Sequence, residues 1–355
     1  MATTRSRKAA AAPTMTTELF VKQFDAIVDN ISTVIKGKSE QIRIALTGFL
    51  AGGNVLFEDM PGTGKTMLAR AFATTINADA SRVQCTPDLL PGDITGSPVL
   101  DRKTGEFVFR PGPVFANVFL ADEINRATPK TQSALLEAMA EQQVTVDGFT
   151  YPLPKPFFVL ATQNPVEQAG TFPLPEAQLD RFLFKLTLGY ADRSAELALL
   201  TANEKHQAID DIQPITDPES ILEMMAFTRE VTVSEAIALY IVDICQATRQ
   251  DTALQVGGSS RASQALRNAA RVMAASQGRD DVLPDDVKKL VSPVLNHRLL
   301  LTPDAMLRDE TVEGVIERIL NRVKLPMGVG GDRSLVAKAK AEAEADRAPA
   351  AAAAG

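Results

Sequence analysis

Short apolar runs alternate with longer amphipathic stretches over the first half of the chain. Five runs have the length and the β-branched or aromatic content of buried strands: 54–57, 82–85, 118–121, 157–161 and 182–186. Segments with helical spacing separate them, and this alternation is typical of a mainly parallel sheet covered on both faces. The pattern therefore predicts an α/β domain over residues 16–190.

After Ala191 the strand pattern stops. The remaining apolar residues recur at helical spacing in the segments 194–206, 218–228, 234–250, 261–275 and 284–290. Ser234 and Pro284 stand where a helix cap and a first-turn proline belong. The second part, residues 191–333, is therefore predicted to be a small all-helical domain.

The two ends of the chain differ from everything between them. Residues 1–15 are mostly Ala, Thr and basic residues without periodicity, and residues 334–355 are rich in Ala. Neither stretch has enough apolar surface to bury, so the first is expected to be a disordered tail and the second an inert Ala-rich tail that forms at most a nascent helix. No run approaches the roughly 20 apolar residues of a membrane span, and no signal-peptide core is evident. We therefore expect a soluble, cytoplasmic protein.

Composition narrows the classes of partner and site. The 355-residue chain has a net charge of -7, no Trp and only 5% aromatic residues. These values argue against a nucleic-acid partner and against base-stacking platforms, although net charge does not exclude a local basic groove. Cys85 and Cys245 lie far apart in apolar contexts and are expected to be inert free thiols, while His206 and His297 have no zinc-ligand spacing.

A glycine-rich loop follows the first strand and opens a helical run. A phosphate chain needs converging backbone N–H groups, a helix N-terminus, a lysine, and a hydroxyl for Mg²⁺. The residues that meet these demands, and that we expect to bind ATP, are Pro61, Gly62, Thr63, Gly64, Lys65, Thr66 and Met67. Asp59 stands where the strict pattern has its first Gly. Two glycines, a lysine and a hydroxyl in this spacing arise by chance in about 1% of chains this long, so an accidental turn is a weak alternative.

Two further strands end in polar residues. The strand 118–121 ends in Asp122, expected with Thr66 to hold Mg²⁺ through water, and Glu123, expected to activate the attacking water. A strand that simply meets solvent would look the same without the upstream loop. The strand 157–161 is followed by Asn164, which could hydrogen-bond that water, and the alternative is an Asn-Pro turn.

Four segments together resemble the MoxR family of AAA+ ATPases. They are 58–66, 121–127, 161–165 and 173–182, and Asp59 in place of Gly is usual in that family. The resemblance spans roughly residues 20–323 and implies an AAA+ P-loop core with a five-stranded sheet, followed by a helical lid. Asn164 then matches sensor 1.

The same resemblance assigns two arginines. Arg181 matches the arginine finger, which reaches the ATP of an adjacent subunit; the alternatives are a local ion pair at Arg181 and Arg126 as the residue that acts between subunits. Arg261 matches sensor 2, in cis or in trans, although Ser260 replaces the usual Pro and a solvated surface arginine is the alternative.

Two hairpins are also expected from turn signals and from the family. One covers about residues 92–113 and resembles the insert in helix 2 of this AAA+ clade. The other turns at Asp147–Gly148 and matches the pre-sensor-1 hairpin. In related ATPases these elements face the ring pore or the partner, whereas a purely structural role is the alternative.

The resemblance also predicts the biological setting. It implies Mg²⁺-dependent ATP hydrolysis in a homo-hexameric ring that remodels or matures client proteins in a chaperone-like manner, including insertion of metal cofactors, with a von Willebrand factor A domain protein as partner. The alternatives are a nucleic-acid motor, a metal-chelatase ATPase subunit of the same clade, and a nucleotide switch without hydrolysis. The presence of Glu123 and Arg181 argues against the switch.

Overall fold

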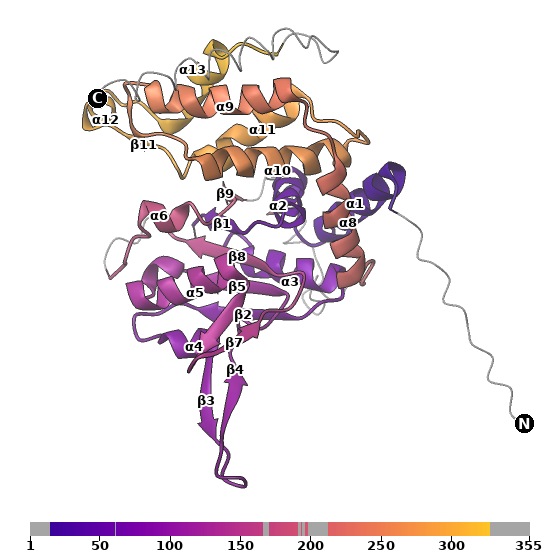
Figure 1. Ribbon diagram of the computed structural model, residues 1–355, viewed down its shortest axis with the longest axis vertical. Coiled ribbons are helices and arrows are strands. Elements are labelled where there is room, and N and C mark those ends of the chain that lie inside the picture. Colours follow the sequence, from indigo (N-terminus) through magenta and orange to yellow (C-terminus); the bar gives the residue numbers. More distant parts are fainter. Residues whose placement is uncertain are drawn as a thin grey trace, which may run out of the picture.

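The computed structural model describes residues 15–60, 62–165, 170–190, Arg193, 196–197 and 212–326 of the 355-residue chain. The predicted tails lie outside these residues except for Met15, and so does the predicted helix at 194–206 except for Glu196 and Leu197. Within them the chain forms a sheet-centred core and a layer of helices above it (Figure 1).

A five-stranded parallel sheet forms the centre of the core. Its strands follow the order β2-β5-β8-β1-β9, and every neighbouring pair is parallel. The strands are β1 (Val55–Glu58), β2 (Ala80–Gln84), β5 (Val118–Asp122), β8 (Phe158–Gln163) and β9 (Phe184–Leu186). All five predicted strands are present, and the predicted mainly parallel sheet is confirmed. Polar residues that follow β1, β5 and β8 therefore meet at one edge of the sheet.

Each face of the sheet supports its own hydrophobic cluster, because successive strand residues point to opposite faces. Phe158 and Leu160 join the cluster beneath α1 (Thr17–Ser32), α2 (Ser39–Leu50) and α3 (Lys65–Thr75). Val159 and Ala161 join the other, which includes residues of α4 (Pro91–Thr95) and α5 (Pro129–Glu141). Both faces are buried, which explains why the strands read as continuous apolar runs.

The second part is a helical lid. Its helices are α8 (Pro218–Glu230), α9 (Glu235–Gln250), α10 (Ser260–Ser276), α11 (Pro284–Leu295), α12 (Pro303–Leu307) and α13 (Val312–Arg322). Ser234 caps α9 by accepting from Ile237 N–H, and Pro284 is in the first turn of α11, as predicted. The lid also contains a two-stranded ladder, β10 (Leu254–Val256) with β11 (Leu300–Leu301), which the all-helical prediction missed. Runs of two or three residues are too short to give a strand signal.

Core and lid share one hydrophobic cluster. The cluster beneath α1–α3 continues without a break into buried residues of α9, α10 and α11. Helix α10 packs against α1 and α2, and α11 packs against β9. In Figure 1, α9, α10 and α11 form the upper layer, while α1, α2 and α8 lie below it toward the right of the view. The lid is therefore packed onto the edge of the sheet formed by β9.

Antiparallel hairpins are present in both segments where the sequence predicts them. Strands β3 (Gly96–Leu100) and β4 (Phe107–Pro111) form the hairpin that projects away from the lid (Figure 1). Strands β6 (Gln143–Val146) and β7 (Phe149–Pro152) turn at Asp147 and Gly148, whose φ angles of 50° and 82° suit a two-residue turn. Phe109 of one hairpin stacks on Tyr151 of the other with ring centroids 4.0 Å apart, so the two hairpins contact each other.

Candidate nucleotide site

The glycine-rich loop joins the carboxyl end of β1 to the first turn of α3. Gly62 and Gly64 have φ angles of 82° and 89°, in the left-handed region that residues with a Cβ seldom adopt. Gly64 is the N-cap of α3, which begins at Lys65. The loop thus passes directly into a helix N-terminus, the arrangement that attracts phosphate. Pro61 lies outside the described residues.

Lys65 is held over the loop. Its Nζ donates to the backbone carbonyls of Asp59 (3.2 Å) and Met60 (2.9 Å) and to Thr63 Oγ1 (3.4 Å). Burial lowers the pKa of Lys65 from its ordinary value, and the carboxylates of Asp59, Asp122 and Glu123 partly oppose that shift. The ammonium group is therefore partly desolvated, which strengthens its attraction to an anion.

Asp122 ends β5 and is almost completely buried, at 9% exposure. Its Oδ1 accepts from Thr162 Oγ1 of β8 at 2.5 Å, and its Oδ2 pairs with Arg82 of β2 at 2.8 Å. The carboxylate is thus fixed by the strands on either side. Thr162 and Arg82 were not among the predicted site residues.

Glu123 follows with a left-handed backbone, φ 54° and ψ 51°. Such a conformation is uncommon for a residue with a Cβ and concentrates at functional sites. Its N–H donates to Thr162 Oγ1 at 2.8 Å, and its Oε2 lies 3.2 Å from Arg126 Nη1. One threonine hydroxyl therefore holds both acidic residues in place, which explains how the backbone can turn here.

Asn164 follows β8 and is 7% exposed. Its backbone carbonyl accepts from Asn125 Nδ2 at 3.4 Å. The residue lines the same cavity as Glu123, so it reaches the place that the sequence predicts for it.

A cavity of about 430 Å³ brings most of the predicted residues together. Its lining includes the loop from Gly62 to Met67, with Asp122, Glu123 and Asn164. Thr66 and Asp122 contribute a hydroxyl and a carboxylate, and such oxygens suit Mg²⁺, which usually keeps several waters and is held by few protein groups. Among the described residues no group of three or more His, Cys, Asp or Glu side chains could hold a metal ion. The fit to a hydrated Mg²⁺ comes from the Thr66 hydroxyl and the Asp122 carboxylate.

A second cavity of about 330 Å³ adjoins the first and was not predicted. The two share Gly62, Thr63, Gly64 and Met67, and the second continues to Val34, Ile35, Gly189 and Tyr190. Lys38 Nζ donates to the Tyr190 carbonyl at 2.6 Å and so joins its two sides. These apolar residues lie between α1 and α2 and after β9, far from the loop in sequence.

Asp59 has a structural task of its own. It is 4% exposed, and its carboxylate accepts from Leu188 N–H (2.7 Å) and Gly189 N–H (2.8 Å). The residue that departs from the strict phosphate-loop pattern thus ties the loop to the segment that leaves the sheet after β9.

Arg181 and Arg261 do not line the cavity. Arg181 precedes β9, and its Nη1 donates to the Leu136 carbonyl of α5 at 2.9 Å. Arg261, at the start of α10, has a side chain that is 67% exposed, with Nη1 3.9 Å from Asp180 Oδ2. Because Leu183 N–H donates to the Asn54 carbonyl, this segment lies beside the amino end of β1, whereas the phosphate loop follows its carboxyl end.

The two cysteines and His297 do not line the cavity. Cys85 and Cys245 are buried free thiols, as predicted. Burial, with Asp122 and Glu123, raises the pKa of Cys85 to about 12, so it stays a thiol at neutral pH. His297 is buried, and its Nε2–H donates to the Phe182 carbonyl at 3.0 Å. His206 lies outside the described residues.

Comparisons with known proteins agree with this geometry. Residues 54–184 match the ATPase family associated with various cellular activities (AAA), and residues 246–319 match an AAA lid domain. The chain is 39% identical over 315 residues to Chaperone MoxR1 of Mycobacterium tuberculosis, covering 86% of this chain and 83% of that protein. It is 32% identical over 321 residues to Protein MoxR of Paracoccus denitrificans, covering 83% of this chain and 94% of that protein.

Two further matches extend the likeness. The uncharacterised protein YeaC of Bacillus subtilis is 49% identical over 300 residues, which cover 84% of this chain and 94% of that protein. A crystal structure of a Cytophaga hutchinsonii protein classed as an ATPase superposes with a TM-score of 0.80 at 39% identity, covering 87% of this chain and 96% of the other. With the parallel sheet, the phosphate loop and the lid in place, these relatives show that the chain belongs to the MoxR family of AAA+ ATPases.

Proposed function

We propose that this chain hydrolyses ATP to ADP and phosphate with Mg²⁺, in the cavity at the carboxyl edge of the sheet. The observation that carries the proposal is the convergence of Lys65, Asp122 and Glu123 in one cavity, from the end of one strand and the start of one helix. Phosphoryl transfer needs positioning and charge stabilisation rather than a covalent intermediate, and this set provides both.

The residues divide the work by position. The N–H groups from Gly62 to Thr66, with Lys65, bind the phosphates at the start of α3. The Thr66 hydroxyl and the Asp122 carboxylate hold the hydrated metal, which neutralises charge on the phosphates when bound. Glu123 accepts the proton of the attacking water, and Asn164 orients that water. Arg126, 3.2 Å from Glu123, orients the base.

The adjoining cavity supports a place for the rest of the nucleotide. It is lined by Val34, Ile35 and Tyr190 on the side away from the phosphate loop, and Met67 lines both cavities. A flat heterocycle attached to the phosphates fits such a partly apolar space. Asp59 fixes the loop to Gly189, so the two cavities keep a constant relation.

Arg181 and Arg261 are proposed to act on the nucleotide of an adjacent subunit. Both lie at the amino end of the central strands, opposite the phosphate loop of their own chain. A strand of four residues separates these edges by roughly 13 Å, more than a side chain spans. The geometry therefore supports a trans role for Arg261 as well as for Arg181, in an oligomer that the family resemblance suggests is a hexamer.

The client side of the function rests on the relatives. One of them carries the name Chaperone MoxR1, which supports a chaperone-like role. Remodelling or maturation of protein complexes, including insertion of metal cofactors, is proposed on family resemblance alone. A von Willebrand factor A domain protein is the proposed partner, on family resemblance alone. No helix among the described residues is long and apolar enough to cross a membrane. We propose that the protein works in the cytoplasm.

The test compares two variants of the same cavity. Lys65→Ala is expected to abolish ATP binding, whereas Glu123→Gln is expected to bind ATP, lower hydrolysis at least about a hundredfold, and populate larger assemblies, since general-base catalysis alone contributes roughly 10²–10⁴-fold. Equilibrium binding, phosphate release and light scattering measure the three effects. Glu141→Gln, at the exposed end of α5, is the matched control. Parent-rate hydrolysis by Glu123→Gln would remove Glu123 from the mechanism.

A further inference from the structure

Arg298 joins the lid to the core through hydrogen bonds from every N–H group of its guanidinium. It follows α11, and its Nε donates to Asp180 Oδ1 at 2.7 Å. The other donors reach the backbone carbonyls of Asp180 (3.3 Å), Phe182 (2.6 Å), Leu183 (3.1 Å) and Val294. A guanidinium has five N–H donors in a fixed fork, and here each has an acceptor. The core segment 180–183 is thus bound by one lid side chain, 118 residues away in sequence.

Because this arrangement is largely buried, a replacement of Arg298 could not be compensated by water. The Arg298 side chain is 4% exposed and that of Asp180 is 19% exposed. His297, the residue before Arg298, donates to the same Phe182 carbonyl that Arg298 contacts. A lysine in place of Arg298 would keep the charge but offer only three donors, leaving buried carbonyls without partners.

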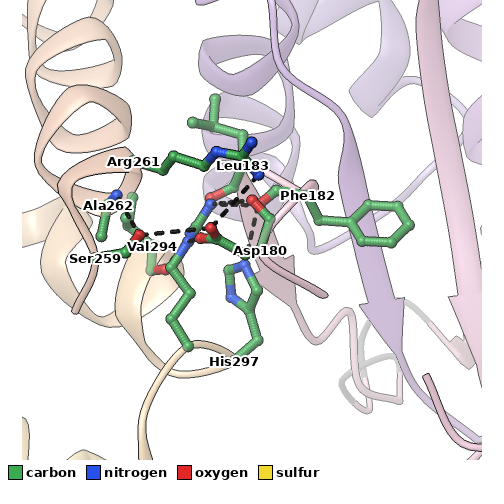
Figure 2. A network of polar contacts seen from close by, with 9 residues as sticks. Asp180, Phe182, Leu183, Ser259, Arg261, Ala262, Val294 and His297 are labelled. Carbon is green, nitrogen blue, oxygen red and sulfur yellow. Dashed lines mark hydrogen bonds and ion pairs between the residues drawn. The ribbon is translucent and has the colours of Figure 1, made fainter. Parts of the chain in front are cut away.

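Asp180 offers its second oxygen to the start of α10. Ser259 Oγ lies 3.5 Å from Oδ2, and Arg261 Nη1 lies 3.9 Å from the same atom. Figure 2 shows Ser259, Arg261 and His297 approaching Asp180, Phe182 and Leu183 from the lid side. Arg181 is the next residue in the chain after Asp180. One carboxylate therefore lies between the two arginines for which a trans role is proposed.

Adhesion between core and lid does not require this pair. The shared hydrophobic cluster already joins α10 to α1 and α2, and a buried ion pair commonly gains little net stability because both charges lose water. What such a pair fixes well is geometry. The exposed side chain of Arg261 would otherwise sample many rotamers, and the segment carrying Arg181 would lose the hydrogen bonds that Arg298 makes to it from the lid.

We propose that Asp180 and Arg298 are positioning residues that hold Arg181 and Arg261 as one unit facing the active site of the neighbouring subunit. This inference rests on the proposed function, because it assigns the pair a task in that reaction. Arg298 fixes the core segment and one oxygen of Asp180, and the other oxygen directs Arg261. Movement of the lid then moves both arginines together.

Asp180→Asn tests the steering separately from the anchor. The amide can still accept from Arg298 with one atom, but it presents an N–H₂ group and no charge to Arg261. We expect kcat to fall about tenfold, since small misplacements of positioned groups cost up to 10²-fold, with ATP affinity unchanged. Asp180→Glu keeps the charge and is expected to recover part of the rate.

Two readouts separate positioning from folding. Mixed with an excess of Lys65→Ala chains, which keep both arginines, Asp180→Asn chains should regain activity, because their own ATP cavities are intact. In a double variant with Arg261→Ala, Asp180→Asn should add less than the product of the two single losses in kcat. A purely structural carboxylate would give neither result.

Asp251→Asn is the matched control within the lid. Asp251 Oδ1 pairs with Arg318 at 3.0 Å and Oδ2 lies 3.9 Å from Arg322, which closely resembles the geometry of Asp180. All of its partners belong to the lid, so its loss should change thermal stability without changing kcat in assembled protein.

The outcomes are distinguishable from failure of the proposed function. Mixing Arg181→Ala with Lys65→Ala chains tests the trans reaction itself, and no recovery there counts against that function. If this reference pair recovers while Asp180→Asn stays inactive in the mixture, or keeps the parent kcat alone, the positioning role is wrong. It is equally wrong if both Asp180 variants fail to fold while Asp251→Asn folds.

Discussion

The two ends of the central sheet are built in contrasting ways. At the carboxyl end, the phosphate loop, Asp122 and Glu123 come from short continuous segments, and each strand delivers its residue directly to the cavity. At the amino end, Asp180 meets Arg298 from 118 residues away, and both arginines proposed to act in trans lie in this region. The first end is thus assembled by local sequence and the second by packing of the lid on the core.

The difference agrees with the task proposed for each end. Backbone N–H groups can hold phosphate once the loop has the right glycines, so a few adjacent residues carry the whole instruction. A charge aimed at another subunit has no such local support, and its direction depends on side chains that hold it from outside. A substitution at the carboxyl end should therefore impair ATP hydrolysis in the chain that carries it. A substitution at the amino end should impair hydrolysis in the neighbouring chain.

The largest expected effect tests whether the amino end acts on the neighbouring subunit. Arg181→Ala should bind ATP normally yet lose roughly 10³–10⁵ in rate, the range seen for arginine fingers. In a titration against Lys65→Ala at fixed total protein, activity should pass through a maximum, because each variant supplies what the other lacks. Phosphate release across the mixing ratios is the measurement.

Arg308→Ala, an exposed lid arginine paired with Glu310, is the control for a simple loss of charge. A flat response to mixing would place Arg181 outside the reaction and make Arg126 the next candidate for contact between subunits.

A smaller effect tests whether damage at the carboxyl end stays within one chain. Asp59→Asn leaves one of the two N–H groups of Leu188 and Gly189 facing an amide N–H₂ instead of an oxygen. An unsatisfied buried donor costs about 1–3 kcal/mol, so we expect a lower melting temperature and weaker ATP binding in the same chain. Mixing with other variants should not restore it. Asp79→Asn, at an exposed position, is the control, and equal effects from both would show that Asp59 has no special task.

The smallest effect concerns pH at the amino end. Burial, and next Arg298, lower the pKa of His297 well below 6.5, so the folded protein keeps it neutral. Below about pH 6.5 the unfolded chain binds a proton that the folded chain does not, and stability should fall by up to ~1.4 kcal/mol per pH unit. Urea unfolding between pH 7.5 and 5.5 measures the free energy of unfolding at each pH. The slope of this free energy against pH should be smaller in His297→Gln. An unchanged slope would mean that other groups dominate.

Sequence patterns predicted the carboxyl end well, because its signals are local. Strand, glycine turn and helix start follow one another at Val55–Thr75, and the acids stand where β5 ends. Thr162 escaped prediction although it directly follows the predicted strand 157–161, since nothing in the neighbouring sequence shows that it holds both Asp122 and Glu123.

The second cavity and the amino end could not be read in the same way. Ile35 and Tyr190 come together only when α1 and the segment after β9 flank the loop. Arg298 looks like any arginine after a helix, and its task appears only once α11 is packed against β9. The short β10–β11 ladder falls below the length at which alternation carries information. In each case the missing information is a long-range contact.

The left-handed backbone of Glu123 places catalysis and stability in opposition at one residue. A side chain with a Cβ in this region costs roughly 1–2 kcal/mol relative to a right-handed conformation, and glycine would remove that cost. Glycine would also remove the carboxylate. If Glu123 has the proposed catalytic role, selection for a sturdier fold and selection for turnover favour different residues at position 123, and the strained glutamate is the residue that favours turnover.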